Sequence, residues 1–458
     1  MSSPTRDRAA LAARARQITE REVEAYGART TKSQAANARA AKVLPLGVPS
    51  SFQFYDPYPV VARRAQASWL EDLDGNRYID FNMGYGALFA GHSHPIMRKA
   101  IEDQLENGTL YVTPSEGNAD VAELLIERFG FDLVRFTNSG TESTMDALRA
   151  AKGYTGRSKI IKVEGGYHGH HDEVMISMKP SLDLAGPADA PNPVPATGGL
   201  TPGVLHDTLV VPFNNIEALE RVLDANKGEV AAFITEPVME NIGICPPDPG
   251  YLEAVREVTQ RHGTMLIFDE VKTGITAGYG GATRRYGVQP DLVCLAKSIG
   301  GGLPIGAFGG RAEVMETITQ GQVLHLGTYN GNPLVMAAAR AVLRDICTRE
   351  AVAEVEARNH RMVDAISKII ADAGLPAHTV EMGAKGCVTY SPTPVRNYRD
   401  YKNTDMDLAF ANWIWGINRG ILLPPGLDEQ WLVSVQHTDA DMDRHIQVFS
   451  EFVSDLVG

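Results

Sequence analysis

The chain has 458 residues, of which 44% are hydrophobic and 22% charged, as in an ordinary soluble globular protein, and this length predicts two or more lobes. Its formal net charge of −13 at pH 7 argues against binding to nucleic acid or to an anionic membrane, because both attract basic surfaces. No apolar run approaches the length of a membrane span.

Residues that could bind a metal or form disulfides are scattered along the chain. The four cysteines show no paired spacing, so we expect reduced thiols in a cytoplasmic protein. They are Cys245, Cys294, Cys347 and Cys387. His92 and His94 flank a single serine, but no further His, Cys or carboxylate spacing supports a metal site. We therefore expect no metal.

The N-terminal region, residues 1–71, is predicted to form an arm and part of a small domain. Residues 1–16 are rich in Ala and Arg, as in an organellar transit peptide, but they carry Asp7 and lack a hydrophobic signal region. We therefore prefer an exposed amphipathic helix. A segment rich in proline and aromatic residues, 46–59, then predicts irregular structure.

Residues 72–345 alternate apolar runs with amphipathic ones and predict a large domain. The expected strands are 133–137, 159–163, 230–235, 264–268, 292–295 and 305–309. The expected helices, with apolar residues at three- and four-residue spacing, are 142–153, 216–225 and 250–262. Near-continuous apolar strands that alternate with helices imply an α/β fold, with a mainly parallel sheet covered by helices.

Two segments depart from this alternation. Residues 179–203 contain six prolines and four glycines, so they cannot form a regular element, and we interpret them as an active-site lid rather than an inert surface loop. Residues 346–458 begin with a long helical run, 349–373, and are predicted to form a smaller, C-terminal α+β domain.

Two strand ends carry complementary chemical groups. Asp269 closes one apolar run, and Lys297 closes a later one, with the glycines 300–302 behind it. Glycines there keep side chains away from a planar ligand and let the backbone turn sharply. A lysine can form a Schiff base, and a buried aspartate can hold a pyridine nitrogen protonated; pyridoxal 5′-phosphate (PLP) needs both groups. Taken alone, Lys297 could instead be a solvated loop lysine, and Asp269 could instead cap a turn.

Short motifs in a fixed order extend this pattern over nearly the whole chain, from about Val43 to the C-terminus. They are Asp74-Gly-Asn-Arg-Tyr-Ile-Asp80, Gly91-His-Ser-His-Pro95, Arg135-Phe-Thr-Asn-Ser-Gly-Thr-Glu142, Tyr154-Thr-Gly-Arg157, Glu164-Gly-Gly-Tyr-His-Gly169, Phe268-Asp-Glu-Val271, Gly327-Thr-Tyr-Asn-Gly-Asn-Pro333 and His437-Thr-Asp-Ala-Asp-Met-Asp-Arg444. They resemble the class III (subgroup II) aminotransferases, PLP enzymes of fold type I. The most similar subgroup contains glutamate-1-semialdehyde 2,1-aminomutase and the β-amino-acid and amine transaminases. The resemblance implies a large PLP-binding domain with a sheet of the seven-stranded type.

The resemblance also implies a phosphate site. Ser139, Gly140 and Thr141 lie where a strand turns into a helix, and N–H groups at a helix N-terminus bind phosphate. The simpler alternative is an ordinary helix cap, since Ser and Thr are favoured there. Thr328 resembles a threonine that reaches the phosphate from the neighbouring subunit, which implies a homodimer with shared active sites.

Around the cofactor ring, the resemblance assigns further contacts. Tyr167 would stack on the pyridine, with His168 in the same ligand-facing turn and Val271 on the opposite face. Asn241 would lie near the 3′-oxygen, and Glu236, at the end of a strand, would support the site from behind.

The residues expected to face the substrate depart from the aminomutase pattern. Gln53 stands where the aminomutase has an arginine that binds a carboxylate, and Ser50 is nearest to an arginine position of the β-amino-acid transaminases. Tyr85 replaces a tryptophan, and Glu429 resembles an acidic residue of the aminomutase site.

A neutral amide cannot reproduce the bidentate grip of a guanidinium on a carboxylate. We therefore expect an aromatic, neutral-to-acidic pocket. Its aromatic members are Phe52, Phe54, Tyr55, Tyr85 and Trp431. Alternatively, Arg63, Arg64 or Arg396 would fold into the site.

The resemblance implies an aminotransferase that moves an amino group between an amine, amino ketone or β-amino acid and a carbonyl acceptor. Lys297 would form the Schiff base and move the Cα proton, and Asp269 would keep the ring protonated. Pyridoxamine 5′-phosphate would be the intermediate form of the cofactor. The alternatives are glutamate-1-semialdehyde 2,1-aminomutase, which forms 5-aminolevulinate, and a racemase of the same fold. A binding protein that kept the fold is disfavoured by the intact lysine and aspartate.

Overall fold

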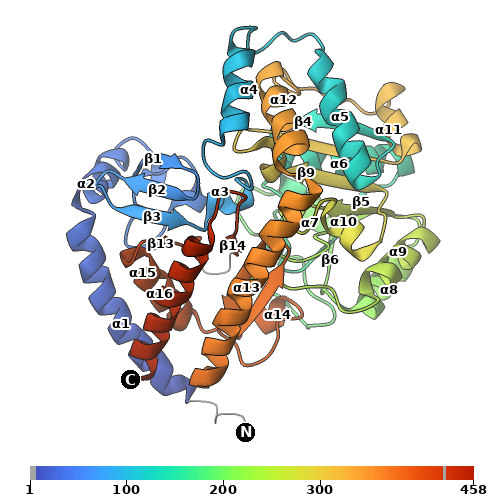
Figure 1. Cartoon of the computed structure of the whole chain (residues 1–458). Coiled ribbons are helices and arrows are strands. Elements are labelled where there is room, and N and C mark those ends of the chain that lie inside the picture. The colour runs from blue at the N-terminus through green and yellow to red at the C-terminus, as the bar shows by residue number, and fades with distance from the viewer. Residues whose placement is uncertain (1–6, 427–429) are drawn as a thin grey trace.

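A seven-stranded sheet forms the centre of the computed structural model, which describes residues 7–426 and 430–458 (Figure 1). The strand order is β4-β10-β9-β8-β7-β5-β6. The bounds are β4 Leu133–Thr137, β5 Lys159–Val163, β6 Thr208–Val211, β7 Val230–Thr235, β8 Met265–Asp269, β9 Leu292–Ala296 and β10 Gly306–Gly310. Strands β6, β5, β7, β8 and β9 pair in parallel, whereas β10 pairs antiparallel with β4 and β9. The predicted α/β fold with a mainly parallel sheet is confirmed.

Helices connect these strands and cover the sheet. Their bounds are α3 Met83–Gly86, α4 Pro95–Leu105, α5 Glu116–Phe129, α6 Gly140–Thr155, α7 Pro202–Asp207, α8 Ile216–Ala225, α9 Tyr251–Arg261, α10 Gly281–Tyr286, α11 Ala312–Thr319 and α12 Pro333–Arg340. Successive residues of β8 enter different cores, because side chains alternate along a strand. Leu266 packs into a cluster with α8 and α9, and Ile267 packs into one with α6 and α11. Both faces of the sheet are therefore buried.

Two smaller sheets lie beside the large one in the fold, and the first of them combines segments from the two ends of the chain. The first has the order β1-β2-β3-β13, with β1 Ala62–Gln66, β2 Trp69–Asp72, β3 Arg77–Asp80 and β13 Ile421–Leu422. The second consists of β11 His378–Met382, β12 Lys385–Thr389 and β14 Trp431–Leu432. Helices α13 Arg349–Ala373, α14 Tyr398–Tyr401, α15 Met406–Asn418 and α16 Asp439–Val457 complete this part of the molecule. The division of the chain at 71/72 and 345/346 stays a prediction.

The N-terminal helix is not simply exposed. Helix α1, Arg8–Arg29, lies along α15 and α16, so the two ends of the chain are side by side (Figure 1), and α2, Thr31–Ala40, follows it. Leu11, Ala15 and Ile18 are buried in this contact. The expectation of an exposed helix is wrong for this face, because α15 and α16 supply the apolar partner.

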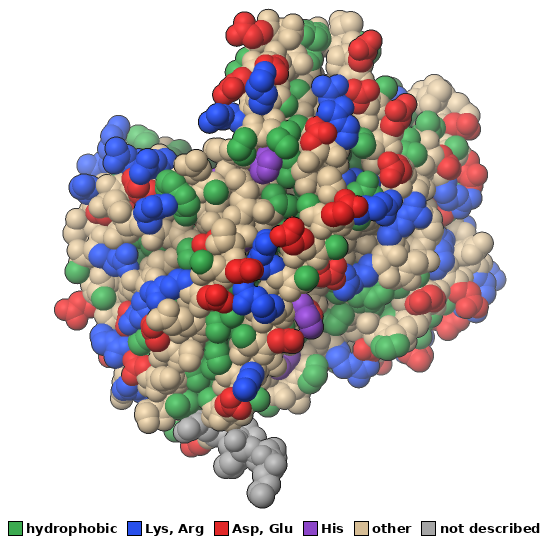
Figure 2. All heavy atoms as spheres, viewed as in Figure 1, with side chains coloured by type: hydrophobic (Ala, Val, Ile, Leu, Met, Phe, Trp, Pro, Cys, Tyr) green, Lys and Arg blue, Asp and Glu red, His purple; other side chains and the backbone are tan. Residues whose placement is uncertain are grey.

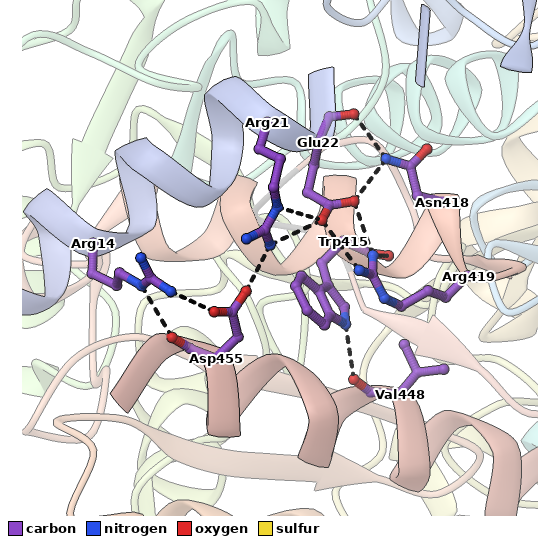
Figure 3. A network of polar contacts seen from close by, with 8 residues as sticks. All are labelled: Arg14, Arg21, Glu22, Trp415, Asn418, Arg419, Val448 and Asp455. Carbon is purple, nitrogen blue, oxygen red and sulfur yellow. Dashed lines mark hydrogen bonds and ion pairs between the residues drawn. The ribbon is translucent and has the colours of Figure 1, made fainter. Parts of the chain in front are cut away.

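Polar contacts also hold α1 in place (Figure 3). Glu22 accepts hydrogen bonds from Arg419 at 2.9 Å and from the Asn418 amide at 3.0 Å, while Arg21 donates to Asp455 at 2.6 Å. Burial opposes ionisation of Glu22, but its bonds to Arg419 and Asn418 outweigh burial and lower the pKa of its carboxyl group. The N-terminal helix is thereby tied to both C-terminal helices.

The proline-rich segment 179–203 has no helix or strand until α7 begins at Pro202. The hydroxyl of Tyr398 donates to the Pro180 carbonyl at 2.7 Å, and Arg399 donates to the Ala185 carbonyl at 3.0 Å. The segment is thus attached to α14, and its role as a lid stays a prediction.

The surface is mixed in charge. On the face drawn in Figure 2, Lys and Arg side chains are interspersed with Asp and Glu over most of the area. None of the helices within 7–426 and 430–458 is long and apolar enough to cross a bilayer. In the same residues, no three His, Cys, Asp or Glu side chains are grouped as they would be around a metal ion.

Candidate active site

Lys297 stands at the point where a buried strand ends. All residues of β9 are buried, and the next residue, Lys297, has φ of +51°, in the left-handed region that non-glycine residues rarely adopt. Such strain persists where the surrounding structure enforces it, often at functional sites. Of the glycines behind it, Gly301 and Gly302 have φ of +59° and +101°, so they let the backbone turn sharply, as predicted, but neither lines the cavity of Lys297. A Cβ at Gly301 would lie 2.4 Å from Met97 Sδ, and one at Gly302 would lie 2.8 Å from a Leu88 methyl. These glycines therefore make room for core side chains.

Asp269 is buried at the end of the neighbouring strand, β8. One carboxylate oxygen, Oδ2, lies 2.8 Å from Nδ1 of His168, and the other, Oδ1, accepts the backbone N–H of Val271 at 3.0 Å. The His168 side chain is fully buried. Because both oxygens are held, the carboxylate has a single orientation.

The N-terminus of α6 approaches this pair closely. Ser139 caps the helix, since its hydroxyl accepts the Glu142 N–H at 3.2 Å. A Cβ at Gly140 would lie 2.9 Å from a Val271 methyl, and one at Gly169, which has φ of +100°, would lie 2.6 Å from Thr141 Oγ1. Only glycine allows either approach, and the result is a helix N-terminus open to an anion.

Glu236, at the end of β7, connects two other predicted contacts. Its Oε1 accepts the Tyr167 N–H at 3.1 Å and the Asn241 amide at 2.9 Å. Burial raises the pKa of its carboxyl group. Glu236 therefore orients Tyr167 and Asn241, and its support of a cofactor stays a prediction.

The structure brings most of the predicted cofactor residues to one cavity of about 140 Å³. Its predicted members are Gly140, Thr141, Tyr167, His168, Glu236, Asn241, Asp269, Val271 and Lys297. Gly169 and Lys272 also line it, and the sequence reasoning missed both. Each directly follows a predicted contact, which is the signal that could have pointed to them. Ser139 caps the helix beside the cavity, and Thr328 lies in a separate hollow with His325 and Asn330.

Aromatic side chains stand next to the cofactor cavity. The ring of Phe52 lies 5.5 Å from that of Tyr167, edge-on, and 6.1 Å from that of Tyr85. The Tyr85 hydroxyl donates to the Phe52 carbonyl at 2.5 Å. Residues 83–86 all have positive φ, between 44° and 88°, so Tyr85 is held in a strained left-handed turn.

The other predicted pocket residues are more scattered. Gln53 shares a hollow with Tyr85, whereas Ser50 and Phe54 are exposed, and Glu429 lies outside the described residues. Tyr55 lines the same hollow as Gln53 and Tyr85, whereas Trp431 is buried in the core. The Tyr55 hydroxyl accepts the Val60 N–H, and the Trp431 indole donates to Asn359.

The three arginines considered as alternatives are occupied elsewhere. Arg64 pairs with Glu71 at 2.8 Å, and Arg63 lies 3.9 Å from the same carboxylate. Arg396 pairs with Asp248. Within 7–426 and 430–458, no arginine lines the cavity of Lys297.

Comparison with known proteins agrees with this geometry. Residues 52–388 match the family model of class III aminotransferases. The chain belongs to this family. Glutamate-1-semialdehyde 2,1-aminomutase 2 of Brevibacillus brevis is 38% identical to this class III aminotransferase over 421 residues, covering 91% of this chain and 96% of that protein. The chain described here is therefore an enzyme of the transaminase type, and it has fold type I.

Two solved structures are similar over most of their length. An omega-transaminase from Sphaerobacter thermophilus is 33% identical with a TM-score of 0.88, covering 93% of this aminotransferase and 98% of that chain. A β-phenylalanine aminotransferase from Variovorax paradoxus is 30% identical with a TM-score of 0.86, and the match covers 96% of this chain and 97% of that chain.

Proposed function

We propose that this aminotransferase binds PLP in the cavity of Lys297, with Lys297 as its attachment point. The observation that carries the proposal is the meeting of three groups in one cavity: the Lys297 amine, the buried Asp269 carboxylate and the N-terminus of α6. An amine can bind an aldehyde, a carboxylate can hold a pyridine nitrogen protonated, and a helix N-terminus can bind phosphate. The residues present therefore fit PLP.

The side chains have separate tasks in the reaction. When bound, PLP supplies an electron sink for the charge left after a substrate proton is removed. Lys297 Nζ takes the proton from the substrate carbon and returns one later. Asp269, oriented by His168, faces the site as a fixed negative charge. Tyr167 and Phe52 exclude water on one side.

For the substrates, we propose an amine, amino ketone or β-amino acid as donor and a carbonyl compound as acceptor. The aromatic residues Phe52, Tyr85 and Tyr167 beside the cavity support a donor with an apolar substituent. The similarity to a β-phenylalanine aminotransferase is consistent with this choice. Glutamate-1-semialdehyde 2,1-aminomutase is the second candidate, favoured by the Brevibacillus relative.

We further propose a cytoplasmic homodimer in which Thr328 serves the partner's active site. Thr328 is exposed, and three apolar neighbours are also exposed: Leu324 by 65%, Leu326 by 81% and Tyr329 by 61%. Clustered exposed apolar side chains favour a protein interface.

The visible spectrum of the purified protein tests the proposed function. The protein is mixed separately with 1-phenylethylamine, 3-amino-3-phenylpropanoate and 4,5-diaminovalerate. Bleaching of the cofactor band with release of a ketone or keto acid is expected for a transaminase. A response to diaminovalerate alone, with 5-aminolevulinate as product, would establish the aminomutase instead. Inversion of a chiral donor without a keto product would indicate a racemase.

Variants of two lysines complete the test. K297A should abolish turnover and covalent retention of PLP, because it removes the amine that attaches the cofactor and moves the substrate proton. K99A is the control, because Lys99 is exposed on α4 and pairs with Asp103. Full activity of K297A would exclude the proposed role of Lys297.

A further inference from the structure

A hollow of about 480 Å³ lies apart from the cofactor cavity, and arginines dominate its wall. It lies where the end of α5, the glycine-rich segment before α10 and the start of α13 meet. The hollow and the cavity of Lys297 have no lining residue in common. The charged residues of its wall are Glu127, Arg128, Arg284, Arg285 and Arg349. Positive charge is thus concentrated in one hollow of a chain whose formal net charge is −13.

Arg128 is a buried cation without a carboxylate partner. The residue is 1% exposed, and its guanidinium group donates to the carbonyl groups of Leu343, Cys347 and Tyr279, the last two at 2.7 and 3.2 Å. Its Nε atom has no hydrogen-bond partner, and among the described residues no carboxylate forms an ion pair with it. Burial lowers the pKa of this guanidinium group. Because a buried charge is costly unless it is paired, a nearby anion would stabilise Arg128.

Two guanidinium groups contact the ring of Tyr279. That of Arg128 lies 3.8 Å from the ring centroid, and that of Arg349 lies 4.0 Å from it. A cation over an aromatic ring is attracted by about 0.5–2 kcal/mol, but the ring carries no net charge. The ring therefore holds the two cations in the wall of the hollow without neutralising them.

Arg284 also contacts backbone oxygens rather than a carboxylate. Its Nε donates to the Arg128 carbonyl at 3.0 Å, and its Nη2 donates to the Glu127 carbonyl at 3.4 Å. In 7–426 and 430–458, no acidic side chain forms an ion pair with Arg284. Arg284 is thus attached to the end of α5 while its charge stays uncompensated.

Two carboxylates offset part of the positive charge. Glu356 pairs with Arg285 at 2.7 Å, and Glu127 lies 3.7 Å from Arg349. The side chains of Arg349 and Glu127 are 67% and 60% exposed, so solvent weakens their pairing. Four positive charges therefore stand against two negative charges, and only the carboxylate of Glu127 lies in the wall itself.

Glycines keep the backbone between the arginines free of side chains. No atom comes within 4 Å of a Cβ built on Gly278, whose φ is +140°. A Cβ at Gly280 would lie 2.6 Å from the Arg128 carbonyl oxygen, so only glycine allows this approach. A ligand can therefore come close to the main chain here.

The chemistry of this wall matches a phosphate group. A guanidinium group is planar and presents N–H donors in a fork that fits phosphate oxygens, often two at a time. A volume of about 480 Å³ is also within the range of sites for small molecules. A phosphate dianion would balance the two excess positive charges.

We propose that this hollow binds the phosphate group of a small molecule, with Arg284 and Arg349 as direct contacts and Arg128 as the buried charge behind them. The site is separate from the cofactor cavity, so the inference goes beyond the proposed aminotransferase function. Free phosphate and a small phosphomonoester share this chemistry.

Calorimetric titration of the PLP-loaded protein at low ionic strength tests the site. The ligands are inorganic phosphate, glycerol 1-phosphate and citrate, and the tighter of the two phosphates identifies the source of the group. R284M and R349M should each weaken phosphate binding about 10- to 100-fold, as for loss of a hydrogen bond to a charged group. E127Q should tighten it about 2- to 10-fold, because it removes the carboxylate from the wall.

A matched variant serves as the control. R261M removes an exposed arginine of α9 that pairs with Glu220, and it should leave each Kd unchanged. If an arginine variant does not fold, E127Q still decides, since tighter binding cannot result from unfolding. Equal phosphate affinity in wild type, R284M and R349M, or no saturable phosphate binding to wild type, would overturn the site. Binding of citrate but of neither phosphate would overturn the assignment to phosphate.

Discussion

The Nδ1 atom of His168 lies 2.8 Å from Oδ2 of Asp269, and both side chains are buried. The second oxygen of Asp269 accepts the N–H of Val271, so the histidine completes the set of contacts that aim the carboxylate into the cavity. A hydrogen bond to a charged group inside a protein contributes about 1.5–3 kcal/mol. The positions are 101 residues apart in the chain.

Removal of the His168 ring should therefore weaken cofactor binding. We expect H168L to raise the Kd for PLP and lower kcat, each by about 10-fold or more. H168N, whose amide can donate from nearly the place of Nδ1, should recover part of the loss. The two quantities are measured by titration of apoprotein with PLP and by initial rates. Equal behaviour of H168L and wild type would mean that the histidine does not orient Asp269.

Gly169 allows a close approach to the backbone at the N-terminus of α6. A Cβ there would lie 2.7 Å from Thr141 Cα, and the φ of +100° disfavours any other residue. G169A should displace the N-terminus of α6 and weaken PLP binding by at least about tenfold, because overpacking and backbone strain both destabilise the native arrangement of the site.

A glycine without close neighbours provides the matched control. Gly27 lies inside α1, and no atom comes within 4 Å of a Cβ built on it. G27A should raise the free energy of unfolding by about 0.5–1 kcal/mol and leave PLP affinity unchanged, since alanine is the better helix former. Urea titration and PLP titration of both variants decide the outcome.

The contacts of Glu22 should contribute measurably to stability (Figure 3). The Glu22 side chain is 5% exposed, but its partners Arg419 and Arg21 are 26% and 51% exposed, so solvent weakens the pairing. We expect E22A to lower the free energy of unfolding by roughly 1–3 kcal/mol. D407A removes the exposed pair with Arg16 and should cost less than about 0.5 kcal/mol. If E22A and D407A lower the free energy of unfolding equally, the buried contacts of Glu22 contribute no more to stability than an exposed ion pair does.

Two buried histidines predict a loss of stability in mild acid. Phe81 lies between His437, stacked at 4.7 Å, and His445, edge-on at 4.8 Å. Burial lowers the pKa of His437 to about 4 and that of His445 to about 3. Because the unfolded chain binds protons below about pH 6.5 and the folded chain does not, stability is full above pH 6.5 and falls from there towards pH 4.

Each of these histidines should lower the free energy of unfolding by about 1.4 kcal/mol per pH unit within that window. Urea titrations at pH 7.5, 6.5 and 5.5 measure the slope. H445Q should reduce it, since glutamine does not titrate, even if the variant is less stable at pH 7.5. An unchanged slope in H445Q would show that His445 is not responsible.

Much of the fold and of the cofactor site follows from local patterns. The six strands expected in the large sheet form within one residue of the predicted limits, and 349–373 is helical throughout. The pattern does not predict β6, because this strand has only four residues and directly follows the short helix α7. Lys297 and Asp269 were recognisable because each ends a buried apolar run. The glycines behind Lys297 show the limit, because the side chains that need their space, Met97 and Leu88, come from distant helices and turns.

The sequence by itself determined the order of the elements, the family and the chemistry at the strand ends, since apolar periodicity and residue type act within a few positions. The tertiary structure decided which distant groups meet. Lys385 and Glu240, which are 145 positions apart, form a buried pair beside Lys272, and α1 packs on the last helices of the chain. No local pattern encodes such contacts, because they depend on how β12 and the large sheet pack together once their apolar faces are buried.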